Sequence, residues 1–451
     1  MSEVLGPESD AEEERPIPSA AGASSAFVEK VSPFRSLRIR NFRLLLVGTV
    51  LSNAGQWIQQ VALNWLVYNL TGSGTMLGSI NMVRAVASLG MIPVAGVLID
   101  RVNRRKIMLM TNGWLFSITL GLGLILLFGH SHISYLFVFA FLGGLAQTVD
   151  QNIRQVVIFD LVPRAVTPNA VAFVQTGWSL MRSFGPGIGG FLILWFGPGG
   201  NFLVQAGAYA LIAITILQIQ FPARKFDAPR GSPLKNIREG IRYVAKERVT
   251  RTFMMMGFIL PLFIIPILSV LPPIYAVDVF HGGPDVLGFL LSAAGIGGII
   301  GGVVTASLGR VDRRGLVQLA SLFLLSLSLI GFAFSTKFLV ALTFVAIAGF
   351  FEMIFLTTNQ TLLQLSIPDN LRGRVTSIVN LNAALSLLGG LVAGVGSDLL
   401  GGPKIITIVL ASIAAGIAVF VFLASSTVRN YRLSQGIAST SARTLEGSTT
   451  Y

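Results

Sequence analysis

The chain has 451 residues, of which 53% are hydrophobic and 12% are charged, and its formal net charge is +13. Soluble proteins carry about 25% charged residues, so this composition excludes an ordinary soluble domain and is typical of an integral membrane protein. Cysteine is absent, which excludes disulfides, thiolate metal sites and cysteine nucleophiles. The three histidines, His130, His132 and His281, lie outside the apolar runs, and we interpret them as solvated loop residues rather than as metal ligands.

Residues 1–32 are acidic and rich in Pro, Ala and Ser, which predicts a disordered tail and not a signal peptide. Twelve apolar runs follow this tail. A helix needs roughly 20 apolar residues to cross the hydrocarbon core of a bilayer, so each run predicts a membrane span. The runs start near Phe42, Met76, Ile107, Ile133, Asn169, Asn201, Arg251, Pro284, Gly315, Lys337, Gly373 and Pro403.

The order of the runs predicts an all-α membrane protein in two parts. We expect one six-helix bundle over residues 33–221 and a second over residues 251–425. The polar, basic segment 222–250 between them predicts a cytoplasmic linker, and its second part, 234–249, has the pattern of an amphipathic helix on the membrane surface. The Ser/Thr-rich residues 426–451 predict a second cytoplasmic tail.

Basic residues gather on one side of this predicted topology. All but five of the 33 Lys and Arg residues lie on the side of both termini and of the loops after even-numbered spans. By the positive-inside rule, this bias predicts a cell (plasma) membrane protein with both termini in the cytoplasm. The positive net charge therefore reflects topology, and no nucleic-acid partner is expected. The five exceptions are Lys337, Lys404, Arg84, Arg154 and Arg182.

Two internal repeats indicate that the second half duplicates the first. The loop RVNRR at 101–105 returns as RVDRR at 310–314, and residues 155–163 match 360–368 in spacing. The second alignment places Gln147 opposite Glu352, Asp150 opposite Phe355 and Arg154 opposite Asn359.

Several motifs resemble a known family. They are GQWIQ at 55–59 with Trp65, LTGS at 70–73, the loop at 96–105, DQNIRQ at 150–155, RSFGP at 182–186 and PDNLRGR at 368–374. Over about residues 34–425 the chain resembles the major facilitator superfamily, and more narrowly its enterobactin-exporter-like branch, the transmembrane secretion effectors. The resemblance implies twelve helices in two pseudo-symmetric six-helix bundles around a central cavity.

The loop after the second span is the first candidate functional element. An acidic side chain such as Asp100 can cap a neighbouring helix N-terminus, and an arginine of this loop can bridge to Asp160. In the second half Gly309 and Leu365 replace these two acids together, which indicates that they act as a pair. The resemblance implies a cytoplasmic latch that holds the outward-facing state; the alternative is that the arginines only fix topology. The candidate gate residues are Gly96, Asp100, Arg101, Arg104, Arg105 and Asp160.

The fifth span carries a proline among glycines. Proline removes a helical hydrogen bond and glycine allows close contact, so a kink is expected there. The sequence resembles the antiporter motif of the superfamily, with small-residue packing as the alternative, and we expect it to pack on a glycine face of span eight. The kink motif is Gly185, Pro186, Gly189 and Gly190, and the expected partner face is Gly297, Gly298, Gly301 and Gly302.

Charged residues within the spans are costly in lipid and are therefore candidates for function. Glu352 is the lone acid deep in the second half, and it is our first candidate for the proton carrier. Asp150 is the second, although its i, i+4 spacing from Arg154 is also that of a structural ion pair. Arg84 and Arg182 are candidates to interact with these acids or with an anionic substrate.

Span one carries a polar stripe at helical spacing, which is unfavourable against lipid and predicts a cavity wall. The stripe consists of Asn53, Gln56, Gln60 and Asn64, with Tyr68 extending it. Aromatic residues are expected to line the cavity or to pack in the core and against lipid: Trp57, Trp65, Trp178, Phe351 and Phe355. The predicted cavity set is Asn53, Gln56, Gln60, Asn64, Trp57, Arg84, Arg154, Arg182 and Phe355.

These features predict a secondary active transporter that exports a hydrophobic or amphipathic small molecule, drug-like or siderophore-like, in exchange for protons. A lipid or lysophospholipid flippase, a nutrient uptake symporter and a non-transporting scaffold are the alternatives. The glycine runs lack a phosphate-loop lysine, and the buried acids lack a nucleophile, so neither ATP, another cofactor nor enzymatic chemistry is expected. We expect a monomer in contact with membrane lipids. Three acids on the outer side, Asp278, Asp285 and Asp398, are interpreted as solvated.

Overall fold

The computed structural model describes residues 35–163, 166–221, 241–307, 312–368, 371, 375, 378–379, 382–429 and 431. The regular elements of this part of the chain are all helical. The first half holds η1 (Ser36–Arg38), α2 (Arg40–Thr71), α3 (Gly74–Arg101), α4 (Arg104–Leu127), α5 (Ile133–Leu161) and α6 (Thr167–Gln218). The second half holds α8 (Arg248–Ile259), η2 (Leu260–Ile264), α9 (Ile265–Ser269), α10 (Pro272–Ile274), η3 (Tyr275–Val279), α11 (Pro284–Ser307), α12 (Arg314–Phe334), α13 (Phe338–Ser366), α15 (Asn382–Leu399), α16 (Pro403–Ala424) and α17 (Ser426–Arg429).

These helices account for the twelve predicted spans. Nine helical segments of the described residues are long and apolar enough to cross a membrane, and the segment from α8 to η3 counts as one of them. A second segment, α6, contains two spans, because Gly197 takes φ 68 and ψ 174 and turns the chain. The shorter apolar helix Ala384–Leu399 within α15 supplies another span. The last is α2, whose polar stripe lowers its hydropathy although its 32 residues are long enough.

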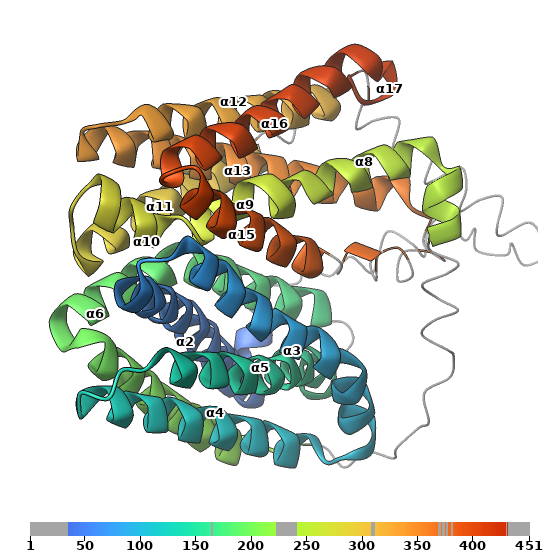
Figure 1. Cartoon of the computed structure of the whole chain (residues 1–451). Helices are drawn as coiled ribbons and strands as arrows, with labels where there is room; N and C mark the ends of the chain where they lie inside the picture. Colours follow the sequence, from blue (N-terminus) through green and yellow to red (C-terminus); the bar gives the residue numbers. More distant parts are fainter. Residues whose placement is uncertain are drawn as a thin grey trace, which may run out of the picture.

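The helices form two bundles (Figure 1). In the first bundle α6 packs against α2 and α4, and α3 packs against α5. In the second, α13 packs against α11 and α12, and α12 against α16. Between the bundles, α3 lies against α15 and α6 against α11. The predicted all-α fold of two six-helix bundles is confirmed.

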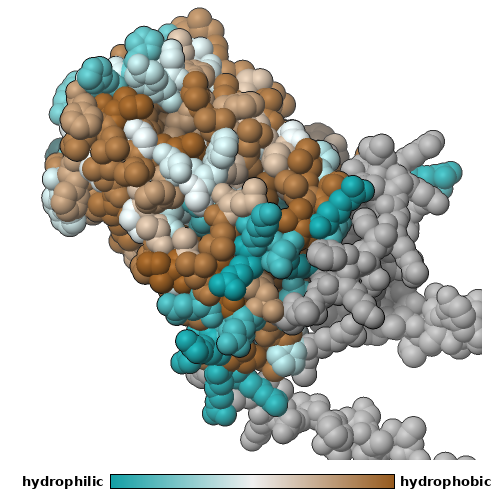
Figure 2. Space-filling model, turned by 90° about the horizontal axis from the view of Figure 1, so that it is seen from below, coloured by the Kyte–Doolittle hydropathy of each residue, from teal (hydrophilic) through white to brown (hydrophobic). Residues whose placement is uncertain are grey.

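We call the end of the molecule that holds Arg40 and Arg429 the terminal face and the opposite end the far face. In Figure 1 the terminal face is on the right, and α3 and α15 lie side by side on the left but diverge toward the right. Figure 2 shows a largely apolar surface, with much of the hydrophilic surface toward the terminal face. Large apolar side chains such as Trp195 and Phe420, each 69% exposed, are stable on such a surface only in contact with lipid.

Local sequence explains the turn between the first two spans. Helix α2 ends because Gly72 takes the left-handed conformation at φ 59. Ser73 then caps α3, since its side chain accepts a hydrogen bond from the Met76 backbone nitrogen at 3.3 Å. The turn therefore fixes the first residues of α3 on the far face.

The predicted tail 1–32 and linker residues 222–240 lie outside the described residues, as do residues 308–311 of the repeated loop and 432–451 of the second tail. Residues 241–246, in the second part of the linker, are helical. The boundaries proposed for the two bundles, the linker and the tails stay predictions.

Candidate functional site

A cavity of about 430 Å³ lies between the two bundles. Helices α2 and α6 of the first bundle line it, together with α11, α13, α15 and the segment from α8 to α10 of the second. Most lining side chains are apolar, and six uncharged polar side chains interrupt them. These are Gln60, Asn64, Ser183, Ser269, Gln360 and Ser386. The site is therefore a largely apolar chamber with a few hydrogen-bonding groups.

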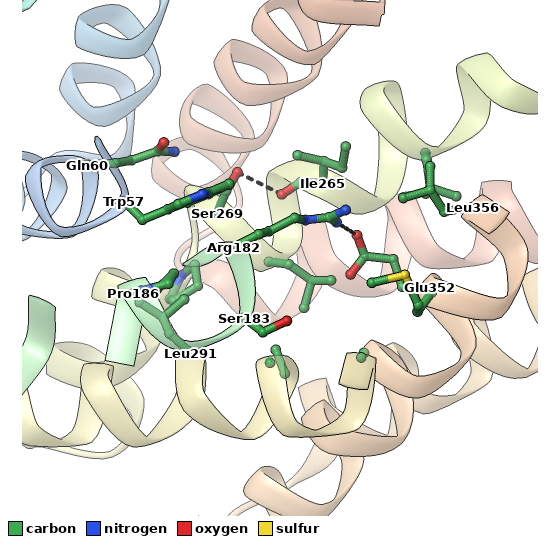
Figure 3. Close-up of a pocket in the computed structure, with 18 of the residues that line it drawn as sticks. Trp57, Gln60, Arg182, Ser183, Pro186, Ile265, Ser269, Leu291, Glu352 and Leu356 are labelled. Atoms are coloured by element: carbon green, nitrogen blue, oxygen red, sulfur yellow. Dashed lines mark hydrogen bonds and ion pairs between the residues drawn. The ribbon is translucent and has the colours of Figure 1, made fainter. Parts of the chain in front are cut away.

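The lining of this cavity contains one cation and one anion, and they pair with each other. Arg182 on α6 donates from Nη2 to Glu352 Oε1 on α13, so the ion pair joins the two bundles (Figure 3). The Arg182 side chain is 21% exposed and that of Glu352 is 12% exposed. The guanidinium also lies 5.8 Å from the centroid of the Trp178 ring, within the range of a cation–π contact. Opposite charges in such a partly dry site attract each other more strongly than in water.

Part of the polar stripe of span one lines the cavity. Trp57, Gln60 and Asn64 belong to the lining. Asn64 also connects the bundles, since its Nδ2 donates to the Ser269 carbonyl at 3.0 Å. Figure 3 shows Trp57 and Gln60 on the opposite side of the site from Glu352.

Two members of the stripe lie outside the lining. Gln56 accepts a hydrogen bond from Gln151 Nε2 at 2.7 Å, and Asn53 is only 8% exposed. The far-face half of the stripe, Gln60 and Asn64, is therefore the part that lines the cavity.

Asp150 and Arg154 do not line the cavity, in contrast to the prediction for Arg154. They pair at 2.7 Å inside the first bundle, with Asp150 1% and Arg154 4% exposed. Asp150 also accepts from Ser52 Oγ at 2.9 Å and from Asn112 Nδ2 at 3.0 Å. Partners on three helices satisfy the carboxylate, so the geometry is that of the structural ion pair, the alternative interpretation.

The second bundle has an uncharged counterpart of this pair. Asn359, which the repeat places opposite Arg154, accepts from Gln318 Nε2 at 2.6 Å. The duplication therefore preserves a polar contact between the fourth and third helices of each bundle, and the charges occur in the first bundle only.

Two other predicted cavity residues also lie elsewhere. Phe355 is 1% exposed and packs in the hydrophobic core, because its side of α13 faces the bundle interior. Arg84 on α3 is half-buried and outside the lining, and its guanidinium makes no hydrogen bond or ion pair with the described residues. Of the remaining aromatic candidates, Trp178 lines the cavity and Trp65 is core.

The kink motif of α6 is a contact surface. A Cβ atom added at Gly185 would lie 2.8 Å from Trp57 Cβ, and one at Gly190 would lie 2.5 Å from the Cα of Gly288 on α11. Gly189 contacts α2 in the same way, and Pro186 lines the cavity. These glycines allow α6 to touch both bundles.

Span eight is the partner of α6, as expected, but two of the four expected glycines face elsewhere. A Cβ at Gly297 or Gly301 would meet backbone atoms of α13, so these two glycines serve packing within the second bundle. The glycines of α11 that lie against α6 are Gly288 and Gly295, by backbone contact, and Gly298, where a Cβ would lie 4.0 Å from Ser183 Oγ.

At the terminal face, three of the candidate gate residues make polar contacts and the other three are exposed. Arg104 Nη1 pairs with Asp160 Oδ2 at 2.7 Å, which ties the start of α4 to the end of α5. Arg105 Nη2 donates to the Leu217 carbonyl at 2.7 Å. Asp100 is exposed, and its carboxylate makes no hydrogen bond or ion pair within the described ranges. Exposed positions also include Arg101 and Gly96, and a Cβ at Gly96 would meet open space.

Two far-face acids were missed by the sequence interpretation. Asp278 and Asp398 are not merely solvated, because both accept hydrogen bonds from residues of the first bundle. Among the three far-face acids, only Asp285 lacks such a contact in the part of the chain that is described.

Residues 31–444 match the model of the family described as transmembrane secretion effector. The chain belongs to this family. It is therefore a member of the major facilitator superfamily and a multi-pass membrane transporter of small molecules, and not an enzyme.

Curated relatives of this transmembrane secretion effector are transporters of similar length. It is 27% identical to the staphyloferrin A transporter of Staphylococcus aureus over 77% of this chain and 87% of that protein. It is 28% identical to the multidrug efflux pump Tap of Mycolicibacterium fortuitum, over 79% and 89%. It is 24% identical to the enterobactin exporter EntS of Escherichia coli, over 75% and 80%.

Solved structures share the fold. A bacterial homologue of the lysosomal transporter Spinster, in an inward-facing and unoccupied conformation, superimposes with a TM-score of 0.68 at 16% identity. The match covers 86% of this chain and 98% of that one. A D-xylose–proton symporter gives a TM-score of 0.62 at 15% identity, over 86% and 97%. At such identities the similarity establishes the fold of the secretion effector and nothing finer.

Proposed function

We propose that this secretion effector exports a hydrophobic or amphipathic small molecule in exchange for protons, by alternating access between the two bundles. The observation that carries the proposal is the Arg182–Glu352 ion pair, which joins the bundles in a cavity whose lining is otherwise uncharged. A charge pair at this place responds both to protons and to the relative position of the bundles.

The chemistry of the cavity supports an amphipathic substrate. Its volume of about 430 Å³ falls within the 300–1,000 Å³ that is typical of sites for drug-sized molecules. Apolar walls and the rings of Trp57 and Trp178 offer contact area, while Gln60, Asn64 and Gln360 offer hydrogen bonds. Relatives named for siderophores and for multidrug efflux agree with such a substrate.

In this proposal, proton coupling arises because a proton and the Arg182 guanidinium compete for the Glu352 carboxylate. A proton on Glu352 removes its negative charge and with it the attraction to Arg182, so the tie between α6 and α13 weakens. A proton that falls through 100 mV releases about 2.3 kcal/mol, which is sufficient for roughly fifty-fold accumulation per charge. Asp150 is a weaker candidate for this role, because Arg154, Ser52 and Asn112 already satisfy it.

The distribution of basic residues indicates from which side of the membrane the substrate enters the cavity. Basic residues cluster at the terminal face, so we place that face and both termini in the cytoplasm of a cell bound by the plasma membrane. The hydrogen bonds between bundles that the described residues make lie from the cavity to the far face. We therefore propose that the conformation is inward-facing, that Asp100 makes no hydrogen bond or ion pair with the described residues in it, and that a substrate enters from the cytoplasm or the inner leaflet.

The proposal is tested with purified monomer in proteoliposomes, with ethidium as the amphipathic probe and a pH-sensitive dye as the proton reporter. We expect wild-type protein to move the probe in the direction opposite to the protons that flow down an imposed gradient, and Glu352→Gln to lose this gradient-driven component. Glu247→Gln is the matched control, since Glu247 precedes α8 outside the cavity. Full gradient-driven efflux by Glu352→Gln would exclude Glu352 as the proton carrier. Drug susceptibility and metabolite secretion of a strain without the gene identify the natural substrate.

A further inference from the structure

A carboxylate of the second bundle caps a helix of the first bundle at the far face. Asp398 Oδ1 accepts the Gly74 backbone N–H at 2.7 Å, and Oδ2 accepts the Thr75 N–H at 2.9 Å. The Ser73 hydroxyl donates to Oδ2 at 2.8 Å. The first N–H groups of a helix have no partner within the helix, and the Ser73 side chain accepts a hydrogen bond only from that of Met76. Asp398 therefore completes the cap of α3 from across the bundle interface.

The position of Asp398 on its own helix is unfavourable without this contact. It is the penultimate residue of α15, and an acid at a helix C-terminus is repelled by the negative end of the helix dipole. The positive N-terminal end of α3 reverses that interaction. The charge of Asp398 is thus placed to stabilise the contact between the helices and not α15 itself.

Close backbone contact makes the cap possible. A Cβ at Gly74 would lie 2.6 Å from the Gly394 carbonyl oxygen, and one at Gly394 would lie 2.1 Å from that of Gly74. A second hydrogen bond between the bundles lies nearby: Tyr68 Oη at the end of α2 donates to Asp278 Oδ2 at 2.5 Å. The far face is therefore closed by charge, by hydrogen bonds and by the lack of side chains.

Helices α3 and α15 run in opposite directions, and each has an acid as its penultimate residue. Asp100 lies at the terminal face and Asp398 at the far face. The two acids belong to opposite ends of one helix pair, and in this conformation Asp398 is engaged while Asp100 is exposed.

We propose that Asp398 is a positioning residue of the transport cycle, which holds the far face closed by capping α3 and releases it when the bundles pivot. This inference rests on the alternating-access function proposed above. The cap exists only while the N-terminus of α3 and the C-terminus of α15 are in contact, so it stabilises one conformation and not the other. Loss of the cap shifts the equilibrium toward the state that is open at the far face.

The natural absence of cysteine allows a direct test on the full chain. Spin labels on Phe128→Cys and Leu339→Cys report the far-face distance between bundles, because these side chains are 73% and 75% exposed near the far-face ends of α4 and α13. The distance distribution is measured by pulsed electron resonance in lipid nanodiscs, without substrate and at fixed pH. Asp398→Asn is expected to raise the ratio of far-face-open to closed protein about fivefold, because the amide lacks the negative charge beside the N-terminus of α3 and one of the two acceptor oxygens.

Matched variants separate this effect from general damage. Asp285→Asn removes a far-face acid that makes no contact between the bundles within the described residues, and it is expected to leave the distribution unchanged. If Asp398→Asn fails to fold, Gly74→Ala carries the test, because its Cβ collides with the Gly394 backbone and forces the far face open. Gly90→Ala on the same helix, where a Cβ meets open space, is its control.

An unchanged distribution in Asp398→Asn, or in Gly74→Ala when that variant is needed, overturns the proposal. The readout needs neither substrate nor a proton gradient, so the outcomes are distinguishable. Loss of coupling in Glu352→Gln with an unchanged far-face distance in Asp398→Asn leaves the proposed function intact and refutes the role of Asp398. Retained coupling in Glu352→Gln with more far-face-open protein in Asp398→Asn refutes the coupling role of Glu352 and supports the cap.

Discussion

Replacing Arg154 with asparagine leaves Asp150 as an uncompensated charge inside the first bundle. Asp150 is 1% exposed, and Ser52 and Asn112 provide neutral hydrogen bonds only. Breaking a buried pair by removing one partner costs about 3–5 kcal/mol, because the remaining charge stays desolvated. We expect Arg154→Asn to lower the free energy of unfolding by about that amount.

The double variant Asp150→Asn with Arg154→Asn removes both charges and makes the site similar to the neutral pair of Asn359 and Gln318. It is expected to be more stable than the single variant, since no charge remains buried. Stability is measured by denaturant unfolding in detergent micelles, followed by tryptophan fluorescence. Equal stability of Arg154→Asn and wild type, or a double variant less stable than the single one, would refute the reasoning. Glu352→Gln, at the partly exposed cavity pair, is expected to unfold close to wild type.

Two further predictions concern packing and binding. Gly295→Ala places a Cβ 2.0 Å from the Ser183 carbonyl oxygen, so α11 and α6 must separate, and we expect most transport to be lost in the proteoliposome assay. Gly416→Ala, where a Cβ meets open space, should transport normally. Trp178→Ala removes the ring beside Arg182 and part of the cavity wall, and we expect ethidium affinity to fall about threefold to thirtyfold, as measured by fluorescence titration.

Each of these two predictions has a result that would contradict it. Wild-type transport by Gly295→Ala would show that the α6–α11 contact is not needed in the cycle. Unchanged ethidium affinity in Trp178→Ala would place the probe elsewhere. Trp195→Ala is the control for tryptophan fluorescence, since this side chain is 69% exposed on the outer surface of the bundle.

The spans were predictable because their physical cause is local. Twenty apolar residues and a sided distribution of Lys and Arg reflect the bilayer itself, which acts on each helix separately. The repeat RVNRR and the paired acids predicted a contact between an arginine of the loop and Asp160, and in the structure Arg104 lies 2.7 Å from Asp160. Local signals also predicted that the segment around Pro186 packs on span eight, which the structure shows, although Gly297 and Gly301 of that span face α13 instead.

The candidate site was predictable only in part, because it depends on how the two bundles meet. Arg182 and Glu352 were each singled out by the cost of a charge in lipid, but their pairing joins residues 170 positions apart. The same criterion selected Asp150 and Arg154, and it does not distinguish a bundle interior from a cavity. The only sequence feature that pointed to the cap formed by Asp398 is an acid near the C-terminus of its own helix, where the helix dipole disfavours it.

Contacts between backbones, such as that of Gly190 with Gly288, leave parts of the bundle interface with few interdigitating side chains. Two helical surfaces whose side chains interdigitate must change many side-chain rotamers before one can move over the other. Surfaces in backbone contact can move with little repacking of side chains. The barrier to reorientation is then low, and a handful of polar contacts decides where the molecule rests. Evolution can therefore retune the preferred state of such a carrier through single surface substitutions, without redesigning its core.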